Sequence, residues 1–201
     1  MMLKRCFDIV CSILGLMIFS PLFIVIPVLI IFDSKGGAFY SSTRVGKDLR
    51  NFRIYKFRTM YSGSDKSSIT IGERDPRITK IGYTLRKYKL DELPQLINVF
   101  AGNMSIVGPR PDVPAYFEYY LQYMPEYYEM KPGITSYSSV YFSDESKLYE
   151  KLSDAAKEYI NKTIPKKVEL DKKYYNHHNL LIDFSIIVMT IKRIFQGNNH
   201  V

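Results

Sequence analysis

Residues 9–32 read IVCSILGLMIFSPLFIVIPVLIIF, a run of 24 residues without a charge that holds Ser20-Pro21 near its midpoint. A straight α-helix of this length would measure about 36 Å, enough to cross the hydrocarbon core of a bilayer. Proline removes a backbone donor and clashes with the carbonyl four residues earlier, and a neighbouring serine can hydrogen-bond a carbonyl so freed. The run therefore predicts a membrane helix bent at Ser20 and Pro21, with two arms of about 12 residues.

Positive charge lies on both sides of this run, so the positive-inside rule gives no preferred direction. The basic residues are Lys4 and Arg5 before the run and Lys35, Arg44, Lys47 and Arg50 after it. We therefore expect both ends on the cytoplasmic side, in a re-entrant hairpin that enters and leaves one leaflet. A single kinked span remains the alternative. A signal peptide is disfavoured because the run is too long, no small-residue cleavage site follows, and Asp8 lies at its entrance.

The charge of the chain predicts an anionic partner. Its formal net charge is +8, and residues 44–110 alone hold 14 Lys or Arg against 6 Asp or Glu. Nucleic acid, an anionic membrane surface and a phosphorylated substrate all fit such a basic segment. The apolar run favours the last two.

Several common kinds of site are excluded by the sequence. Cys6 and Cys11 are the only cysteines, so neither a disulfide framework nor a thiolate metal site is expected. The HExxH, GxxxxGKS/T and GxGxxG patterns are absent, which excludes the usual zinc-protease, P-loop and dinucleotide motifs. The length of 201 residues suits one compact domain beside the run. We expect a membrane segment with its flanks at 1–34 and one catalytic domain at 35–201.

The remaining chain predicts an α+β fold that is mainly helical, with short strands and amphipathic interfacial helices. Aromatic and basic residues interleave over residues 52–58, which is typical of a half-buried strand and also of a nucleic-acid-binding surface. Helices are expected at 78–103 with Gly102 at the end, at 112–130 with a break at Pro125, at about 144–162, and at 180–196. KPGIT at 131–135 predicts a turn, and residues 61–76 predict a surface loop, with a lid as one role.

The last of these helices contains three charged residues, Asp183, Lys192 and Arg193. It is too polar to span a membrane, and we expect it to pack on the domain or to lie in the interface. The aromatic residues of 112–130 fit either the core or a lipid interface.

The chemistry is expected in KLDELPQL at residues 89–96, where Asp91 and Glu92 are adjacent carboxylates just before Pro94. Proline in a first turn marks a helix start, and a helix N-terminus favours ionised carboxylates and bound phosphate. Mg²⁺, which prefers oxygen ligands and substrate phosphates, would relieve the repulsion between acid and phosphate. Spacing alone favours a plainer interpretation, with Asp91 as an N-cap and Glu92 as a first-turn acid.

Four stretches of sequence decide between these interpretations. They are KRCFD (4–8) before the apolar run with its Ser-Pro, RVGKDLRNFRIYKFRTM (44–60), DPRITKIGYTLRKYKLDELPQLINVFAGNMSIVGPRP (75–111) and KPGIT (131–135). Together they resemble the bacterial monotopic phosphoglycosyl transferases over nearly the whole chain. Small members of that family combine a re-entrant membrane helix with one catalytic domain on the cytoplasmic face of the inner membrane.

The resemblance implies a reaction and its partners. A sugar 1-phosphate would pass from a UDP-sugar to undecaprenyl phosphate or another polyprenyl phosphate, with release of UMP. This step initiates a capsule, O-antigen, exopolysaccharide or glycoprotein glycan. The implied partners are the UDP-sugar, the lipid acceptor and membrane lipids, with no nucleic acid, and a homo-oligomer is compatible with the sequence. The sugar, the glycan and the oligomeric state stay open.

The resemblance also implies roles for Asp91 and Glu92, which form an Asp-Glu dyad, and for nearby basic residues. Asp91 matches the nucleophile and Glu92 its partner acid, with Mg²⁺ as the cofactor that both would hold. Asp91 would attack the β-phosphorus to form an acyl phosphate, which the lipid phosphate then displaces, so ping-pong kinetics are expected. Phosphate contacts are implied for Arg86, and also for Lys56 and Arg58.

Three further motifs match the family. Pro109 and Pro111 fix the backbone on both sides of Arg110, which is assigned to UDP. Ser20 and Pro21 match the motif that bends the membrane helix. Lys4, Arg5 and Asp8 match its entry signature, where charged groups would hold the hairpin at the membrane interface. Asp171 and Tyr174 align with a late Asp and Tyr of the family, and their roles stay open.

The chain departs from the family pattern after KPGIT. Members commonly continue with GWAQVNGR, whereas residues 136–143 read SYSSVYFS, so Ser139, Tyr141 and Ser143 replace the usual Gln, Asn and Arg. This change concerns sugar recognition more than catalysis.

Two other functions fit the sequence less well. A catalytically silent scaffold that recruits glycan-assembly enzymes is disfavoured by the intact dyad. A membrane-tethered nucleic-acid binder lacks any RNA-binding or helix-turn-helix signature.

Overall fold

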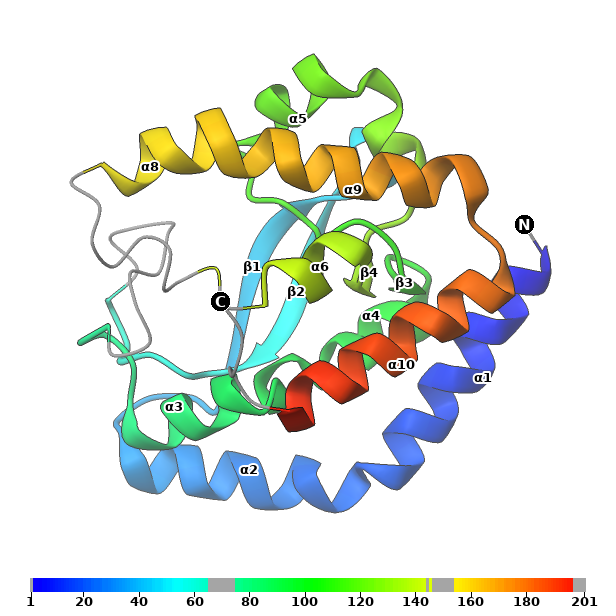
Figure 1. Cartoon of the computed structure of the whole chain (residues 1–201). Coiled ribbons are helices and arrows are strands. Elements are labelled where there is room, and N and C mark those ends of the chain that lie inside the picture. Colours follow the sequence, from blue (N-terminus) through cyan, green and yellow to red (C-terminus); the bar gives the residue numbers. More distant parts are fainter. Residues whose placement is uncertain (1, 65–74, 144, 146–153, 197–201) are drawn as a thin grey trace.

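Helices surround two small sheets in the part of the chain that the computed structural model describes, residues 2–64, 75–143, 145 and 154–196 (Figure 1). This mixture confirms the expected α+β class. The first half comprises α1 (Met2–Ile18), α2 (Ser20–Asp33), β1 (Phe39–Val45), η1 (Lys47–Leu49), β2 (Asn51–Phe57), α3 (Lys80–Lys87), η2 (Leu90–Glu92), α4 (Gln95–Ala101) and β3 (Ser105–Val107). It is followed by α5 (Phe117–Tyr123), η3 (Pro125–Glu129), β4 (Gly133–Thr135), α6 (Tyr137–Tyr141), α8 (Ala155–Glu158), η4 (Tyr159–Thr163), α9 (Ile164–His177) and α10 (Leu180–Gln196).

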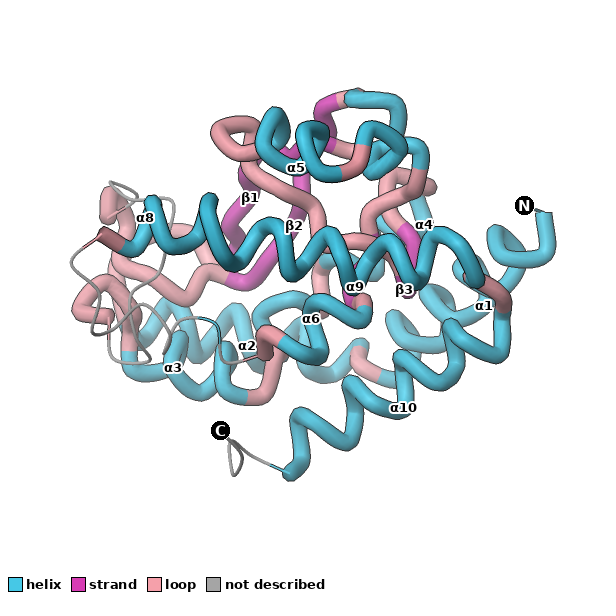
Figure 2. The backbone as a smooth tube through the Cα atoms, turned by 45° about the horizontal axis from the view of Figure 1, so that its top comes forward, coloured by secondary structure: helices cyan, strands magenta, loops and turns pink. Residues whose placement is uncertain are grey.

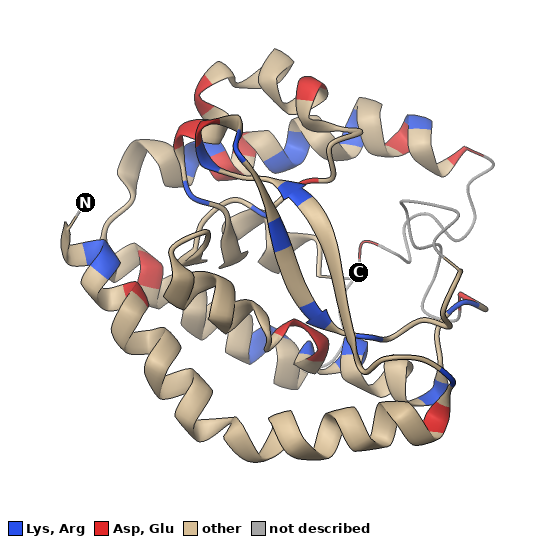
Figure 3. Cartoon of the chain, turned by 180° about the vertical axis from the view of Figure 1, so that it is seen from behind, with Lys and Arg blue, Asp and Glu red and all other residues tan. Residues whose placement is uncertain are grey.

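Helices α1 and α2 form a bent pair along one edge of the domain (Figure 1). Their axes differ by 59° across the break, Ser20 Oγ donates to the Met17 carbonyl at 2.8 Å, and Pro21 lies in the first turn of α2. The predicted bend is therefore confirmed. Within the described residues, only the two helices together, and neither alone, have the length and apolarity of a membrane span. Figure 3 shows this stretch free of charge from Asp8 to the end of α2.

The start of α1 is fastened to the domain by the three charged residues of the entry signature. Lys4 Nζ pairs with Asp183 Oδ2 of α10 at 2.7 Å, and Arg5 donates to the last backbone carbonyls of α4 at 2.6 and 2.7 Å. Buried Asp8 accepts from Ser105 Oγ at 2.8 Å and from a backbone N–H of β3 at 2.9 Å. The sequence predicted these groups at a membrane interface, whereas their partners here belong to the protein.

The other end of the pair is fastened to the same domain. Asp33 Oδ2, at the end of α2, accepts from the backbone N–H of Ile81 in α3 at 3.0 Å. Ile26 and Ile30 of α2 are buried in one apolar cluster with Phe57 of β2 and Leu85 of α3. Burial of this kind stabilises the fold by roughly 25 cal/mol per Å² of apolar surface. Both ends of the bent pair are thus attached to one body.

Strands β1 and β2 form an antiparallel hairpin whose register runs from Phe39 opposite Phe57 to Val45 opposite Asn51. Arg53 and Tyr55 are exposed, whereas Phe52 and Ile54, which alternate with them, are half-buried and buried. This alternation confirms the prediction of a half-buried strand over residues 52–58.

Strands β3 and β4 pair in parallel, with Ser105 opposite Gly133 and Val107 opposite Thr135. The prediction of a turn throughout KPGIT is wrong at residues 133–135, because their partner strand lies far away in sequence. A Cβ atom at Gly133 would lie 2.1 Å from the backbone nitrogen of Gly108, so this approach requires glycine.

The C-terminal helices differ in extent from those predicted. Part of the predicted 144–162 helix lies outside the described residues, and the rest continues from α8 through the π-helical turn η4 into α9 at His177. Pro165 lies at the junction between η4 and α9 and does not stop this helix. Helix α10 has the predicted bounds of 180–196. Figure 2 shows α6 beside α9, and α6 contacts both α9 and α10.

The aromatic segment 112–130 belongs to the core. The break before Pro125 is confirmed, since α5 ends at Tyr123 and η3 begins at Pro125. Tyr120, Tyr127 and Tyr128 are buried in one cluster with residues of α9. The core interpretation therefore holds for these three side chains.

Candidate active site

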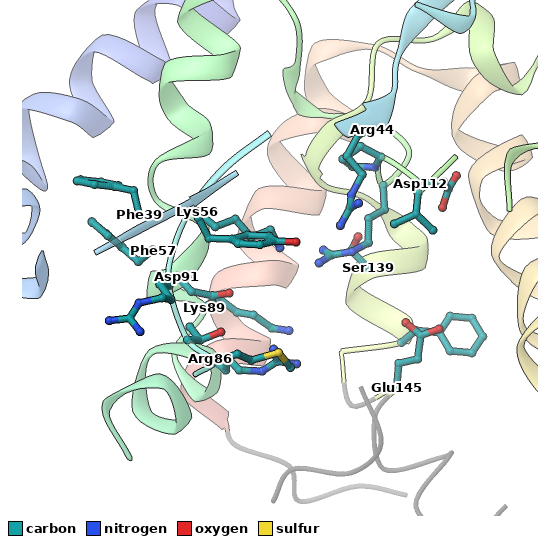
Figure 4. Close-up of a pocket in the computed structure, with 18 of the residues that line it drawn as sticks. Phe39, Arg44, Lys56, Phe57, Arg86, Lys89, Asp91, Asp112, Ser139 and Glu145 are labelled. Atoms are coloured by element: carbon teal, nitrogen blue, oxygen red, sulfur yellow. The ribbon is translucent and has the colours of Figure 1, made fainter. Parts of the chain in front are cut away.

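A polar cavity of about 710 Å³ lies between the β1–β2 hairpin, the η2 turn and helices α6 and α9 (Figure 4). Figure 4 shows Lys56, Arg86, Lys89 and Asp91 on one side of it, with Arg44, Asp112, Ser139 and Glu145 across from them. Side chains from five separate segments of the chain thus meet in one space.

The turn that carries the two acids is set by a change in backbone direction after α3. Lys89 has a φ of 55°, in the left-handed region, which costs a non-glycine residue about 1 kcal/mol. The next residues form the 3₁₀ turn η2, and α4 begins at Gln95 after Pro94. The predicted helix at 78–103 is therefore two helices with a turn between them, and Gly102, at φ 90°, ends the second as expected. Asp91 and Glu92 lie one turn before α4 rather than in its first turn.

Glu92 is held by two cations. Its Oε1 accepts from Lys56 Nζ at 2.7 Å and from Arg110 Nη2 at 2.6 Å, whereas no described group donates to Oε2. Burial by itself would raise the pKa of Glu92, but Arg110 and Lys56 outweigh it and hold that pKa well below its ordinary value. Burial lowers the pKa of Lys56, and Glu92 opposes that shift. The short contacts are those of an ionised pair, so we infer that Glu92 is a carboxylate and Lys56 an ammonium.

Asp91 has a different environment, although it is the neighbouring residue. Its side chain is buried and makes no hydrogen bond or ion pair with any described residue. Burial raises the pKa of Asp91, and Lys56 opposes this effect. The sequence predicted both carboxylates ionised by the helix dipole, and the pKa of Asp91 shifts in the opposite direction. Its oxygens are available to a substrate in the cavity.

Three more cations line the cavity near Asp91. Arg86, at the end of α3, and Lys89 make no side-chain hydrogen bond or ion pair with the described residues, so their charges are available to an anion. Arg44 of β1 was not predicted as a site residue, although it opens the stretch RVGKDLR; burial, followed by repulsion from Arg110, lowers its pKa. The cations suit a diphosphate.

Arg58 lines the cavity, but its guanidinium is engaged elsewhere. It donates to the backbone carbonyls of Ser34, Lys35 and Gly37 at 2.8, 2.8 and 2.6 Å, in the segment after α2. These bonds join β2 to the end of the bent pair. Arg58 thus has a structural role in addition to lining the cavity, and its contact with phosphate stays a prediction.

The segment around Arg110 is positioned by the β3–β4 pair. The Pro109 carbonyl accepts from the Gly133 backbone N–H at 2.8 Å, and Pro111 lines the cavity. Arg110 was assigned to UDP from the sequence, and in the structure its guanidinium pairs with Glu92. Contact of Arg110 with a nucleotide stays a prediction.

The facing wall of the cavity includes the segment in which the sequence departs from the family. Residues 137–141 form α6, and Ser138 and Ser139 line the cavity together with Asp112 and Lys167. Burial raises the pKa of Asp112 to about 7, with Lys167 opposing this shift. Lys167 Nζ pairs with Glu145 Oε1 at 2.7 Å. The sequence linked the segment of Ser138 and Ser139 to sugar recognition, whereas Asp112, Glu145 and Lys167 were not predicted as functional, since their spacing follows no local pattern.

Asp171 supports this wall from behind. Its Oδ2 accepts from Ser138 Oγ at 2.9 Å and from the Tyr127 hydroxyl at 3.1 Å, while its buried Oδ1 has no hydrogen-bond partner in the described ranges. Burial raises its pKa to about 6. Tyr174, the other late residue, donates to Asp183 Oδ1 at 2.6 Å and so joins α9 to α10.

The dyad also suits Mg²⁺. No group of three or more His, Cys, Asp or Glu side chains with metal-binding geometry occurs among the described residues. Mg²⁺ is commonly held by one or two carboxylates together with substrate phosphates. Asp91 and Oε2 of Glu92 supply such oxygens beside a cavity lined by cations, so the residues present fit this ion.

Comparison with known proteins places this chain in a family. Residues 1–197 match the family described as bacterial sugar transferase. The chain belongs to the bacterial sugar transferase family. A relative in Aeromonas hydrophila, "UDP-N-acetylgalactosamine-undecaprenyl-phosphate N-acetylgalactosaminephosphotransferase", is 34% identical, and the match covers 97% of this chain and 44% of that protein.

Two further relatives are informative. "UDP-glucose:undecaprenyl-phosphate glucose-1-phosphate transferase" of Escherichia coli (strain K12) is 36% identical over 96% of this sugar transferase and 40% of the relative. "Exopolysaccharide production protein ExoY" of Sinorhizobium fredii is 34% identical over 95% of this chain and 84% of the relative. The sugar transferase described here therefore spans about two fifths of the first two relatives and most of the third.

Proposed function

We propose that this bacterial sugar transferase moves a sugar 1-phosphate from a UDP-sugar to undecaprenyl phosphate and releases UMP. The observation that carries the proposal is Asp91, a buried carboxylate that has no hydrogen-bond or ion-pair partner among the described residues and lies in a cavity lined by cations. The names of the relatives in Aeromonas hydrophila and Escherichia coli support the substrate class. The product would initiate a glycan such as an exopolysaccharide.

The reaction proceeds in two displacements at one phosphorus atom. The ionised carboxylate of Asp91 attacks the β-phosphorus of the UDP-sugar, a new P–O bond forms, and the P–O bond to UMP breaks. The aspartyl phosphosugar so formed keeps the sugar while UMP leaves. An oxygen of undecaprenyl phosphate then attacks the same phosphorus and expels Asp91 as a carboxylate, which restores the enzyme.

The other residues prepare this chemistry electrostatically. Arg86, Lys89 and Arg44 supply positive charge for the diphosphate. Glu92 holds Arg110 and Lys56 in place, so that Lys56 favours the ionised form of Asp91. Mg²⁺, held by Asp91 and Glu92 when bound, would offset charge on the diphosphate and on departing UMP. Ser138 and Ser139 of α6 face the same cavity and are candidates for sugar contacts.

The test is an assay with purified protein in detergent, Mg²⁺, undecaprenyl phosphate and a panel of UDP-sugars that begins with UDP-glucose and UDP-N-acetylgalactosamine. We expect one donor to release UMP in proportion to lipid product, and wild-type enzyme incubated with that donor alone to carry one phosphosugar on Asp91 by mass spectrometry. Asp91→Asn should do neither. If no donor releases UMP while the protein is folded, a silent scaffold is the better explanation.

We also propose that α1 and α2 form a re-entrant hairpin in the inner membrane, with the catalytic domain, residues 35–201, on the cytoplasmic face. Support comes from Lys4 and Asp8 at one end and Asp33 at the other, which bond to the same domain. A helix that crossed the bilayer would place its ends on opposite sides, about 30 Å apart.

Cysteine labelling tests this topology. In a variant in which serines replace Cys6 and Cys11, single cysteines at positions 2 and 36 should both react from the cytoplasm and neither from the periplasm. Labelling of position 2 only from the periplasm would overturn the hairpin.

A further inference from the structure

A second cavity, of about 590 Å³, lies against the η2 turn and is lined mainly by apolar side chains. Its walls come from α1, from the segment that leads into α4, and from α10. We call it the apolar groove and define it by Gly15, Phe19, Leu93, Leu96, Ile191 and Ile194.

The apolar groove and the polar cavity share one wall. Arg86, Lys89 and Arg110 line both, whereas Asp91 lines the polar cavity and Glu92 lines the groove. Arg110 Nη2 pairs with Glu92 Oε1 at 2.6 Å, whereas Arg86 and Lys89 have no side-chain partner among the described residues. A ligand in the groove would therefore meet two available positive charges at its inner end, next to the reacting carboxylate.

The outer rim of the groove belongs to surfaces that suit a bilayer. Phe195 of α10 lines the groove and is an exposed apolar residue. Leu14 and Met17, one and two residues from Gly15 in the uncharged stretch of α1, are exposed apolar residues as well. The groove thus connects an apolar outer surface with a cationic inner wall.

We propose that the apolar groove binds the first isoprene units of the polyprenyl phosphate acceptor and directs its phosphate to Arg86 and Lys89. The chemistry of the groove matches an apolar chain that ends in an anion. The inference rests on the proposed function and adds the site of the acceptor chain. An in-line attack on the aspartyl phosphosugar places the acceptor phosphate where UMP has left, so the head group crosses the shared wall while the chain stays in the groove.

Cys11 lines the groove and supplies a readout that does not depend on turnover. In a Cys6→Ser variant, the rate of maleimide labelling of Cys11 in detergent micelles is measured alone, with undecaprenyl phosphate and with dioleoyl phosphatidic acid. We expect undecaprenyl phosphate to slow labelling at least about fivefold and phosphatidic acid to leave it within twofold. Equal protection by both lipids would make the groove a general lipid site and overturn the proposal.

Ile191→Trp fills the groove from α10 at a position that is 49% exposed, so the fold should tolerate it. We expect the KM for undecaprenyl phosphate to rise about tenfold, the KM for the UDP-sugar and the kcat at saturating acceptor to stay within twofold, and the protection of Cys11 to be lost. Leu181→Trp is the matched control, because Leu181 lies on the same helix, is 83% exposed and does not line the groove.

The two proposals fail in different ways. If no UDP-sugar is turned over but undecaprenyl phosphate still protects Cys11, and Ile191→Trp abolishes that protection, the groove stands and the activity is wrong. If the wild type is active but Cys11 labels equally with and without the acceptor, or Ile191→Trp leaves the acceptor KM unchanged, the groove is not the acceptor site.

Discussion

Within the wall that separates the polar cavity from the apolar groove, formed by β2 and η2, Glu92 is held by Lys56 and Arg110 at 2.7 and 2.6 Å. On the facing wall formed by α6 and α9, Asp171 is held by the hydroxyls of Ser138 and Tyr127 at 2.9 and 3.1 Å. Cations stabilise the charged form of an acid, whereas hydroxyls compensate burial only in part. The pKa of Glu92 accordingly lies well below its ordinary value, and that of Asp171 rises to about 6.

The two walls therefore have different roles. The first wall keeps charges permanently in place around Asp91, as charge stabilisation in phosphoryl transfer requires. The second wall gives the cavity its shape through hydrogen bonds, and its acids titrate close to neutral pH. We therefore expect substitutions on the first wall to change the chemistry most, and those on the second wall to change stability and its dependence on pH.

The largest effect is expected from Asp91→Asn, which should lower turnover at least about 10³-fold because the nucleophile is lost. Burial raises the pKa of Asp91 in the folded state, so its charged form opposes folding above its unfolded pKa. The free energy of unfolding at pH 7 should therefore stay equal or increase in the variant. UMP release and urea denaturation measure the two effects. A large loss of stability would show that Asp91 is structural.

Glu92→Gln should leave Lys56 and Arg110 without their anion. Breaking a buried pair costs about 3 kcal/mol, and we expect about 2 kcal/mol because the Arg110 side chain is 39% exposed. Urea denaturation of Glu92→Gln, Arg110→Gln and the double variant forms a cycle. The loss of unfolding free energy in the double variant should be smaller than the sum of the losses in the two single variants. Strict additivity would contradict the pairing.

Asp112→Asn should alter how stability depends on pH. In the folded state the pKa of Asp112 is raised to about 7. The stability that its protonated carboxyl contributes is therefore complete below the ordinary pKa of 3.8 and is lost as the pH rises to 7. Between pH 5 and pH 7, the free energy of unfolding of the wild type should fall by about 2 kcal/mol relative to that of the variant, because of the titration of this one carboxyl group. Denaturation at several pH values measures this difference.

The smallest effect is expected from Ser138→Ala. It removes one of the two hydroxyls that bond Asp171 and should cost about 1 kcal/mol. Ser139→Ala is the control. Within the part of the chain that the structure describes, the Ser139 hydroxyl meets only the hydroxyl of Ser136, so its loss should cost less than about 0.5 kcal/mol. Thermal unfolding compares the two. Equal stability of both variants would mean that Ser138 does not support the wall.

Local patterns predicted much of the architecture. The apolar run with Ser20 and Pro21, the alternation over residues 52–58 and the bounds of 180–196 all depend on neighbours within a few residues, and each is confirmed. Strand β4 was missed because its partner strand lies elsewhere in the chain, and the continuation of the helix beyond residue 162 into α9 was not predicted.

The candidate site was predicted in composition but not in arrangement. The sequence proposed Asp91, Glu92, Lys56, Arg58 and Arg110, and the structure brings all of these except Glu92 to the polar cavity. Arg58 turned out to hold the end of the bent pair through backbone carbonyls that no pattern in its own strand reveals. The signal for the facing wall was the departure at residues 136–143, which marked the segment but not its neighbours on α9.

By itself, the sequence determined that this protein has a bent apolar helix pair, a half-buried hairpin and two adjacent acids in a basic segment. Those features follow from residue type and short-range spacing. Only the tertiary structure decided which acid is neutralised and which is left without a partner, since Lys56 and Glu92 lie 36 residues apart and meet only when β2 packs on η2. The interactions that set the charge of a buried group fall steeply with distance, so its chemistry depends on the groups that folding places beside it.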